Sequence, residues 1–275
     1  MPTFIYVYGL IPSPELELTA LPSFVGMDGA NHAYALPLGE ITAVVCELDD
    51  AEYGEEALQE RMNHDMAWLQ EKAMHHHETL LMLNSRYTLI PMKLFTIHKS
   101  QASLEHKVDN AREPITALFA KLRDREEWNV KIFCNDAALR ERVKLQDPVI
   151  AAKQQEISGL SPGRQFFEKK KIEKWIDRQL EEYKNQTCSE LHDQFSRYAQ
   201  AETVKRNWSK EATGRQENMS WNSVYLLPSN MVERFLSEIQ AKKAAYEDQG
   251  WTIEASGPWP AYHFVALSEQ SEPVA

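Results

Sequence analysis

Runs of β-branched and aromatic residues alternate with longer amphipathic stretches along the first half of the chain. Residues 3–8 form such a run and predict a strand that ends at Gly9. Residues 32–38 and 40–48 form two more, and their junction at Gly39 favours a β-hairpin. From residue 55 to 83 the apolar positions recur every three to four residues, which predicts one long amphipathic helix.

Two prolines mark the next elements. Residues 86–95 predict a strand, and Pro91 inside it should lie at an edge or a bulge because proline has no N–H to donate. Residues 104–122 predict a second helix, which Pro114 is expected to kink.

The middle of the chain is mostly helical by its pattern. After a predicted strand at 127–134, interruptions at 147–148 and 158–163 divide the helical stretch. Ser161 followed by Pro162 fits a helix start, with serine as N-cap and proline in the first turn. The helix that follows is long and charged, so we expect a projecting helix or a helical hairpin. Residues 208–216 are polar and predict a loop.

The last third repeats the alternation of strand and helix. A strand is predicted at 221–227, then a helix that ends at Gly250, then strands at 251–255 and 262–267 separated by a turn. Strands and helices thus form two clusters, which predicts an α+β protein of two domains, 1–125 and 126–275. The second cluster fits a split βαβ, ferredoxin-like domain.

Composition narrows the classes of function. The 275 residues carry a formal net charge of −11, which argues against nucleic-acid binding and against contact with an anionic membrane. No apolar run is long enough to span a bilayer, and the N-terminus predicts a strand rather than a signal peptide. Three widely spaced cysteines suggest neither a disulfide framework nor a cysteine zinc site. We therefore expect a cytoplasmic protein with no membrane or nucleic-acid partner.

The cluster His75-His76-His77-Glu78, with His64 upstream, is the strongest candidate for catalysis. Ligands on one helix face need three- or four-residue spacing, but adjacent histidines point in different directions, and no HExxH motif is present. The simpler interpretation is that these histidines make structural hydrogen bonds. A metal-dependent hydrolase that uses His64, His76, His77 and Glu78 remains the competing hypothesis.

Other catalytic signatures are missing from the sequence. The stretch from Gly159 to Arg164 is too short for a phosphate loop and lacks its lysine, and no GxSxG motif occurs. We expect no enzymatic activity, no metal and no cofactor. The seven tryptophans indicate either core packing or interface anchors, because tryptophan serves both. In the segment Gly257-Pro258-Trp259-Pro260, two prolines stiffen the backbone around Trp259, which suits either role equally.

Several motifs, in order along nearly the whole chain, resemble those of the gas vesicle protein F/L family (GvpF/GvpL). The ending, residues 257–264, closely matches Gly-Pro-Trp-Pro-Pro-Tyr-x-Phe, with Ala261 in place of the second proline. The earlier motifs are Tyr6-Val7-Tyr8-Gly9, Trp68 with His77-Glu78, Leu89-Ile90-Pro91-Met92-Lys93 with Thr96, Glu127-Trp128-Asn129-Val130-Lys131, and Ser161-Pro162-Gly163-Arg164 with Phe166-Phe167. One departure concerns Lys93-Leu94-Phe95-Thr96, where the family usually has Arg-Phe-Gly-Thr. The missing glycine puts the expected backbone conformation there in question.

The resemblance implies a non-enzymatic role in making gas vesicles. Family members are thought to bind the small hydrophobic shell protein (GvpA-type) and to assist its assembly. The alternative within the same system is a scaffold among other accessory proteins that never touches the shell. The implied fold has two α+β domains, the second a modified ferredoxin-like one, with the C-terminal segment packed back onto the body. The implied protein-binding candidates are the motif positions Trp68, His77, Glu78, Pro91, Lys93, Thr96, Trp128, Lys131, Gly163, Arg164, Trp259, Pro260 and Tyr262.

Overall fold

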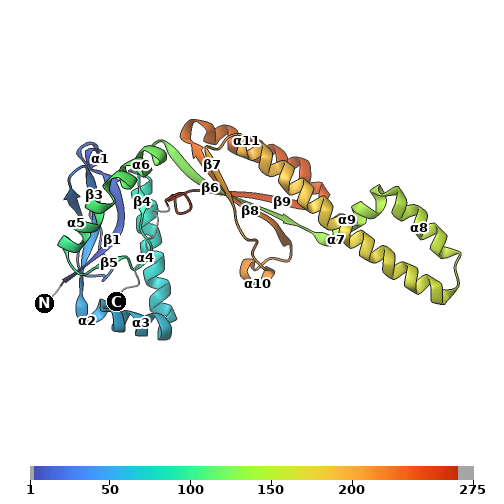
Figure 1. The fold of residues 1–275 in the computed structure, drawn as a ribbon, viewed down its shortest axis with the longest axis horizontal. Coiled ribbons are helices and arrows are strands. Elements are labelled where there is room, and N and C mark those ends of the chain that lie inside the picture. The colour runs from blue at the N-terminus through green and yellow to red at the C-terminus, as the bar shows by residue number, and fades with distance from the viewer. Residues whose placement is uncertain (1–2, 266–275) are drawn as a thin grey trace. The chain divides into compact units, whose positions relative to one another are not determined.

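The computed structural model describes residues 3–265, in which helices and two antiparallel sheets are mixed (Figure 1). The α+β class predicted from the sequence is therefore confirmed. The chain divides into two compact units. Among the described residues, the first unit holds those from 3 to 126 together with those from 258 to 265, and the second holds Glu127–Gly257. The sequence pattern had instead kept 126–275 together.

The first unit is built on a five-stranded sheet with the order β2-β3-β1-β4, and β5 also pairs with β1. Its strands are β1 (Thr3–Pro12), β2 (Tyr34–Leu38), β3 (Ile41–Asp49), β4 (Ile90–Pro91) and β5 (Ile97–His98). The predicted hairpin is β2–β3, in which Leu38 pairs with Ile41 and Gly39 adopts a φ of +77°. Pro91 lies in the edge strand β4, where its missing N–H breaks no ladder.

The predicted strand at 86–95 is wrong in extent, because only Ile90 and Pro91 pair within it. Both are buried beside β1, where Pro91 is opposite Gly9. The chain then leaves the sheet in a turn and returns as β5. The apolar residues of this stretch alternate because several of them are buried at the edge of the sheet. They do not form a continuous set of hydrogen-bonded pairs with β1.

Helices cover the first sheet, and both helices predicted for this unit are divided. The helices are α1 (Ser13–Leu18), α2 (Asp50–Tyr53), α3 (Glu55–His64), α4 (Met66–Asn84), α5 (Gln101–Asn110) and α6 (Arg112–Leu122). The helix predicted at 55–83 breaks at Asp65, whose carboxylate accepts a hydrogen bond from the Trp68 backbone N–H and so caps α4. The helix predicted at 104–122 breaks at Ala111, which places Pro114 in the first turn of α6, where proline is tolerated.

The second unit has a four-stranded sheet with the order β7-β8-β6-β9. Its strands are β6 (Arg125–Cys134), β7 (Ala201–Val204), β8 (Asn218–Pro228) and β9 (Trp251–Trp259). Its helices are α7 (Asp136–Gln146), α8 (Pro148–Ser158), α9 (Pro162–Ser196), α10 (Lys210–Thr213) and α11 (Val232–Tyr246), with short 3-10 turns η1 (Ser229–Met231) and η2 (Glu247–Gln249). The larger elements follow one another as β-α-β-β-α-β, the succession of a split βαβ unit. The short helix α10 lies inside the stretch predicted as a loop.

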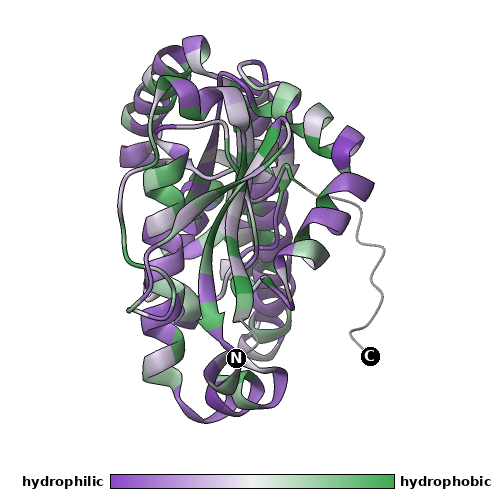
Figure 2. Cartoon of the chain, turned by 90° about the vertical axis from the view of Figure 1, so that its left-hand side faces the viewer, coloured by the Kyte–Doolittle hydropathy of each residue, from purple (hydrophilic) through white to green (hydrophobic). Residues whose placement is uncertain are grey.

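The longest helix, α9, has 35 residues and serves two purposes within this unit. Its C-terminal part buries Leu191 and Phe195 in the same core as Tyr225 and Phe235. Its N-terminal part extends beyond the sheet and pairs with α8, so that the two helices form a projecting hairpin (Figure 1). The helices carry both hydrophilic and hydrophobic stretches, as expected for helices that pack along one face (Figure 2).

The C-terminal segment differs from its predicted form. Strand β9 continues through Gly257-Pro258-Trp259, where the sequence predicted a turn. Residues 262–264 form a turn instead of the predicted strand, and positions 266–267 of that strand lie outside the described residues. None of the helices between residues 3 and 265 combines the length and the hydropathy needed to cross a bilayer.

Candidate protein-binding surfaces

His75 and His76 attach helix α4 to the sheet of the first unit. His76 Nδ1 lies 2.6 Å from the Tyr6 hydroxyl, and its Nε2 lies 3.1 Å from the Met92 carbonyl oxygen. His75 Nε2 lies 2.9 Å from the Tyr8 hydroxyl. Burial lowers the pKa of His76 to about 4, although the bond to Met92 opposes this shift, so the ring is neutral at pH 7. The hydrogen bonds that the simpler interpretation expected for His76 are present.

His77 faces the C-terminal segment. Its Nδ1 lies 3.1 Å from the Tyr262 hydroxyl, and its ring centre is 5.5 Å from that of Trp259. Pro260 is buried in the same segment, whereas Tyr262 stays partly open to solvent. Trp259 and Tyr262 of the C-terminal segment therefore both contact α4 through His77. Glu78, the next residue of α4, is exposed.

The proline-containing motif ends in a tight turn. The Thr96 N–H donates to the Lys93 carbonyl at 3.1 Å, and the Thr96 hydroxyl donates to the same oxygen at 2.7 Å. Phe95, at the third position of this turn, has a φ of +60°. A type II turn requires a positive φ at its third residue and at no other, and glycine normally occupies that position. The conformation is thus the one a glycine would favour, although this chain has phenylalanine there.

Packing explains why Phe95 is held in this conformation. Its ring stacks on Trp68 of α4 with centroids 5.6 Å apart and an interplanar angle of 5°. The Arg61 guanidinium lies 5.2 Å from the centre of the Trp68 ring. Trp68 of α4 therefore contacts both α3, through Arg61, and the turn, through Phe95.

In the second unit, Trp128 and Lys131 of β6 contribute to different surfaces. Trp128 packs on the core, and Gly257 of β9 lies so close that a Cβ there would be 2.8 Å from the indole ring. The Lys131 ammonium lies 4.1 Å from the centre of the half-exposed Trp208 ring. Burial and the neighbouring Lys205 lower the pKa of Lys131. This cation–π contact is solvent-accessible.

Gly163 and Arg164 lie in the first turn of α9, at the far end of the hairpin, and both are exposed. Phe166 and Phe167 follow them with exposed fractions of 65% and 66%. Their rings form an edge-to-face pair with centroids 5.8 Å apart. Two large exposed aromatic side chains that pack mainly on each other are a candidate contact surface.

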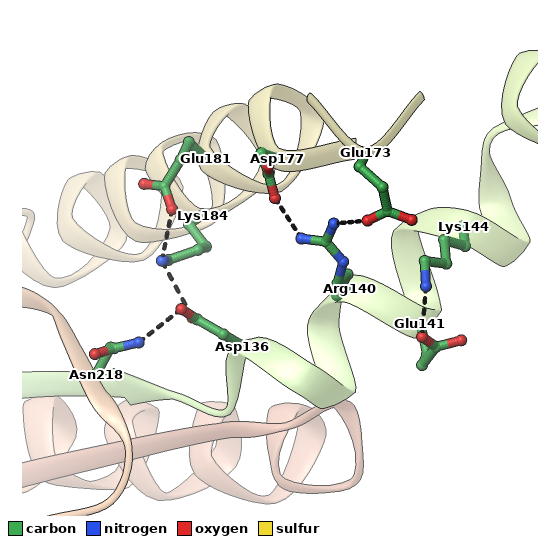
Figure 3. A network of polar contacts seen from close by, with 9 residues as sticks. All are labelled: Asp136, Arg140, Glu141, Lys144, Glu173, Asp177, Glu181, Lys184 and Asn218. Carbon is green, nitrogen blue, oxygen red and sulfur yellow. Dashed lines mark hydrogen bonds and ion pairs between the residues drawn. The ribbon is translucent and has the colours of Figure 1, made fainter. Parts of the chain in front are cut away.

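A polar network at the base of the hairpin had no counterpart in the sequence analysis (Figure 3). The buried Lys184 of α9 lies 3.2 Å from an Asp136 carboxylate oxygen, and Asn218 of β8 donates to the other oxygen at 2.6 Å. Burial by itself would raise the pKa of Asp136, but hydrogen bonds from Cys134 and Lys184 outweigh it and lower that pKa. The network therefore connects α7, α9 and β8.

Arg140, one turn further along α7, extends this network by bridging Glu173 and Asp177 of α9. These contacts fix the direction in which the hairpin leaves the sheet. No periodicity in the sequence signals them, because the partners are distant along the chain.

A family model described as "Gas vesicle synthesis protein GvpL/GvpF" matches residues 4–266. The chain belongs to the GvpL/GvpF family. It is 23% identical to gas vesicle protein L of Streptomyces sp. (strain CB03234) over 84% of this chain and 82% of that protein. It is 24% identical to gas vesicle protein F1 of Halobacterium salinarum over 96% of this chain and 93% of that one.

Solved GvpF structures support the fold. The crystal structure of GvpF from Anabaena sp. PCC7120 superposes with a TM-score of 0.72 at 19% identity, over 97% of this chain and 99% of that one. GvpF from Microcystis aeruginosa gives a TM-score of 0.63 at 18% identity, over 96% and 99%. Membership of the GvpL/GvpF family, shown by the match over residues 4–266, gives this chain a gas vesicle-associated role, as the sequence motifs indicated.

The GvpL/GvpF motif positions fall into two groups in the structure. Most make internal contacts or close a turn, including Trp68, His77, Thr96, Trp128 and Trp259. Gly163 and Arg164 instead lie on the exposed end of the hairpin, and Glu78 is exposed on α4. The exposed positions remain the stronger candidates for protein binding, and this assignment stays a prediction.

Proposed function

We propose that this member of the GvpL/GvpF family binds the hydrophobic gas vesicle shell protein and assists its assembly. One observation supports the proposal most directly. Of the twelve large hydrophobic side chains that are exposed among the described residues, five lie between 145 and 175, on the hairpin and the end of α7. These are Leu145, Val149, Phe166, Phe167 and Trp175. Surface apolar residues gathered on one projecting element are typical of a protein-binding site.

The charge of the chain suits such a role. A protein that builds a gas-tight wall exposes apolar surface before it assembles, and such surface aggregates. A partner with a formal net charge of −11 that covers this surface would keep the complex dispersed by electrostatic repulsion. No substrate or chemical step is needed for this function.

The test is co-expression of the tagged full-length chain with the shell protein. We expect the shell protein to be retained on the affinity resin and its sedimenting fraction to fall in the presence of the chain. A chain that neither retains the shell protein nor reduces its aggregation would refute the proposal. If the chain retains other accessory gas vesicle proteins but not the shell protein, the scaffold hypothesis is correct instead.

A further inference from the structure

The end of the helical hairpin carries a local charge opposite to that of the whole protein. We define the hairpin tip as residues 159–175, which contain five Lys and Arg but two Asp and Glu, for a net charge of +3. The whole chain carries −11, so the remainder carries −14. A concentration of positive charge on an acidic protein needs a local explanation, because average solubility does not require it.

Pairing within the protein increases this asymmetry. Both carboxylates of the hairpin tip are engaged, since Lys171 donates to Glu168 at 2.7 Å and Arg140 binds Glu173. No ion pair within residues 3–265 engages the other basic side chains of the tip, which are Arg164, Lys169, Lys170 and Lys174. The tip therefore presents cations whose charge is not compensated by the described part of the chain.

The exposed aromatic residues lie on the same helix face as part of this charge. In α9, Lys170 is four residues after Phe166 and three after Phe167, and Lys174 follows Lys170 by four. Positions three and four apart are neighbours on a helix surface. The opposite face of the helix is used internally, because Ile172 and Ile176 are buried in the core of the second unit. The outward face is thus an aromatic pair continued by lysines.

Trp175 limits how much of the hairpin is available. Its indole N–H lies 3.3 Å from an Asp147 carboxylate oxygen, and the Lys153 ammonium lies 5.5 Å from its ring centre. These contacts hold α8 against α9 and leave the phenylalanine pair, at 65% and 66% exposed against 37% for Trp175, as the most exposed apolar part of the tip. A partner must therefore offer apolar side chains to Phe166 and Phe167 and negative charge to the lysines beside them.

We propose that the hairpin tip docks an amphipathic segment of the shell protein whose apolar face is bordered by carboxylates. This inference rests on the proposed function and adds the surface and the chemistry of the partner. Burial of two exposed phenylalanine rings supplies affinity, and complementary charge supplies orientation and rate. A bilayer fits less well, because the remaining net charge of −14 is repelled by an anionic lipid surface.

The first experiment compares variants of the full-length chain in capture of co-expressed shell protein. We expect two double variants each to reduce the retained shell protein at least about tenfold. Phe166→Ser with Phe167→Ser removes the apolar burial, and Lys170→Glu with Lys174→Glu removes the charge complementarity. Circular dichroism should be unchanged, since all four side chains are exposed.

Matched controls change similar residues elsewhere. Leu18→Ser with Met66→Ser removes two exposed apolar side chains, and Lys99→Glu with Lys243→Glu reverses two exposed charges, both outside the tip. Both controls should retain the shell protein as the wild type does. If the tip variants retain it equally well, the docking inference is wrong while the proposed function stands.

A second experiment tests the partner chemistry without the shell protein. Two labelled amphipathic peptides of equal length, one of Leu and Glu and one of Leu and Lys, are titrated with the chain and followed by fluorescence anisotropy. We expect the Glu peptide to bind at least about tenfold more tightly at low salt and the difference to shrink as salt is added. Equal affinities, or no loss of Glu-peptide binding in the tip variants, would overturn the inference.

Lipid binding is examined by sedimentation with phosphatidylglycerol vesicles. If the wild type sediments with vesicles and the tip variants do not, the tip is a lipid-binding surface and the inference is wrong. If the wild type captures no shell protein in the first experiment, the proposed function fails, and the peptide titration alone decides whether the tip recognises acidic amphipathic segments.

Discussion

The turn at Phe95 allows a direct test of stored backbone strain. A non-glycine residue in the left-handed region costs about 1–2 kcal/mol, whereas at an unstrained position glycine is about 0.4–1 kcal/mol less stable than alanine. Phe95 has a φ of +60°, so the usual order should reverse there. We expect Phe95→Gly to be more stable than Phe95→Ala by about 0.5–1 kcal/mol.

Both substitutions also remove the ring that stacks on Trp68. An aromatic pair contributes about 0.5–1.5 kcal/mol beyond its burial, so both variants should be less stable than the wild type unless strain relief offsets this loss in Phe95→Gly. In a Trp68→Ala background, the cost of removing the Phe95 ring should shrink by about the same amount. The difference between glycine and alanine should persist there, because it arises from the backbone.

The assay is urea unfolding followed by circular dichroism. Leu94, the preceding residue of the same turn, is the matched control because it has no positive φ. There, Leu94→Gly should be less stable than Leu94→Ala. If glycine is the less stable residue at both positions, the left-handed conformation of Phe95 does not store the strain that we assign to it.

Three further predictions concern other contacts. Gly257→Ala should destabilise the protein by about 2 kcal/mol or more in thermal unfolding, because the added Cβ would clash with the β6 strand. Gly163→Ala is the control and should be close to neutral, because a Cβ there meets no atom within 4 Å. Burial lowers the pKa of His76 from 6.5 to about 4, so the stability associated with its neutral ring is complete above pH 6.5 and declines by up to about 3 kcal/mol as the pH falls toward 4. In His76→Gln, the free energy of unfolding should vary less with pH than in the wild type. If the two proteins give parallel curves of unfolding free energy against pH, the pH dependence does not come from His76. Lys184→Met should cost about 2 kcal/mol because it leaves the Asp136 charge without its partner, whereas Lys171→Met, in an exposed pair, should cost less than about 0.5 kcal/mol in the same unfolding assay.

The sequence predicted elements best where burial follows a local period. The β2–β3 hairpin and the apolar positions of α4 were read from alternation and from three- to four-residue spacing. Breaks inside periodic stretches were missed. Asp65 ends one helix and caps the next, but it interrupts the apolar pattern no more than any polar residue does. Within the β-like stretch at 86–95 only Ile90 and Pro91 pair, although most of the stretch is at least partly buried, and alternation alone cannot separate burial from pairing.

The candidate surfaces depended on the structure more heavily. The motif positions could be named from the sequence, but their separation into internal contacts and an exposed hairpin tip could not. The indole of Trp259 lies against His77, and the His77–Tyr262 pair joins residues 185 positions apart. Exposure of Phe166 and Phe167 is also a tertiary property, because aromatic residues in a helix usually predict core.

By itself, the sequence determined the α+β class, the order of most elements and membership of the gas vesicle family, because these follow from local periodicity and from motifs in a fixed order. Only the tertiary structure decided which polar groups meet, including His76 with Tyr6 and Lys184 with Asp136. It also decided that Phe95 adopts a left-handed backbone conformation, which glycine normally favours. The physical reason is that such pairings and strained conformations are fixed by packing between segments distant along the chain, and no local pattern records them.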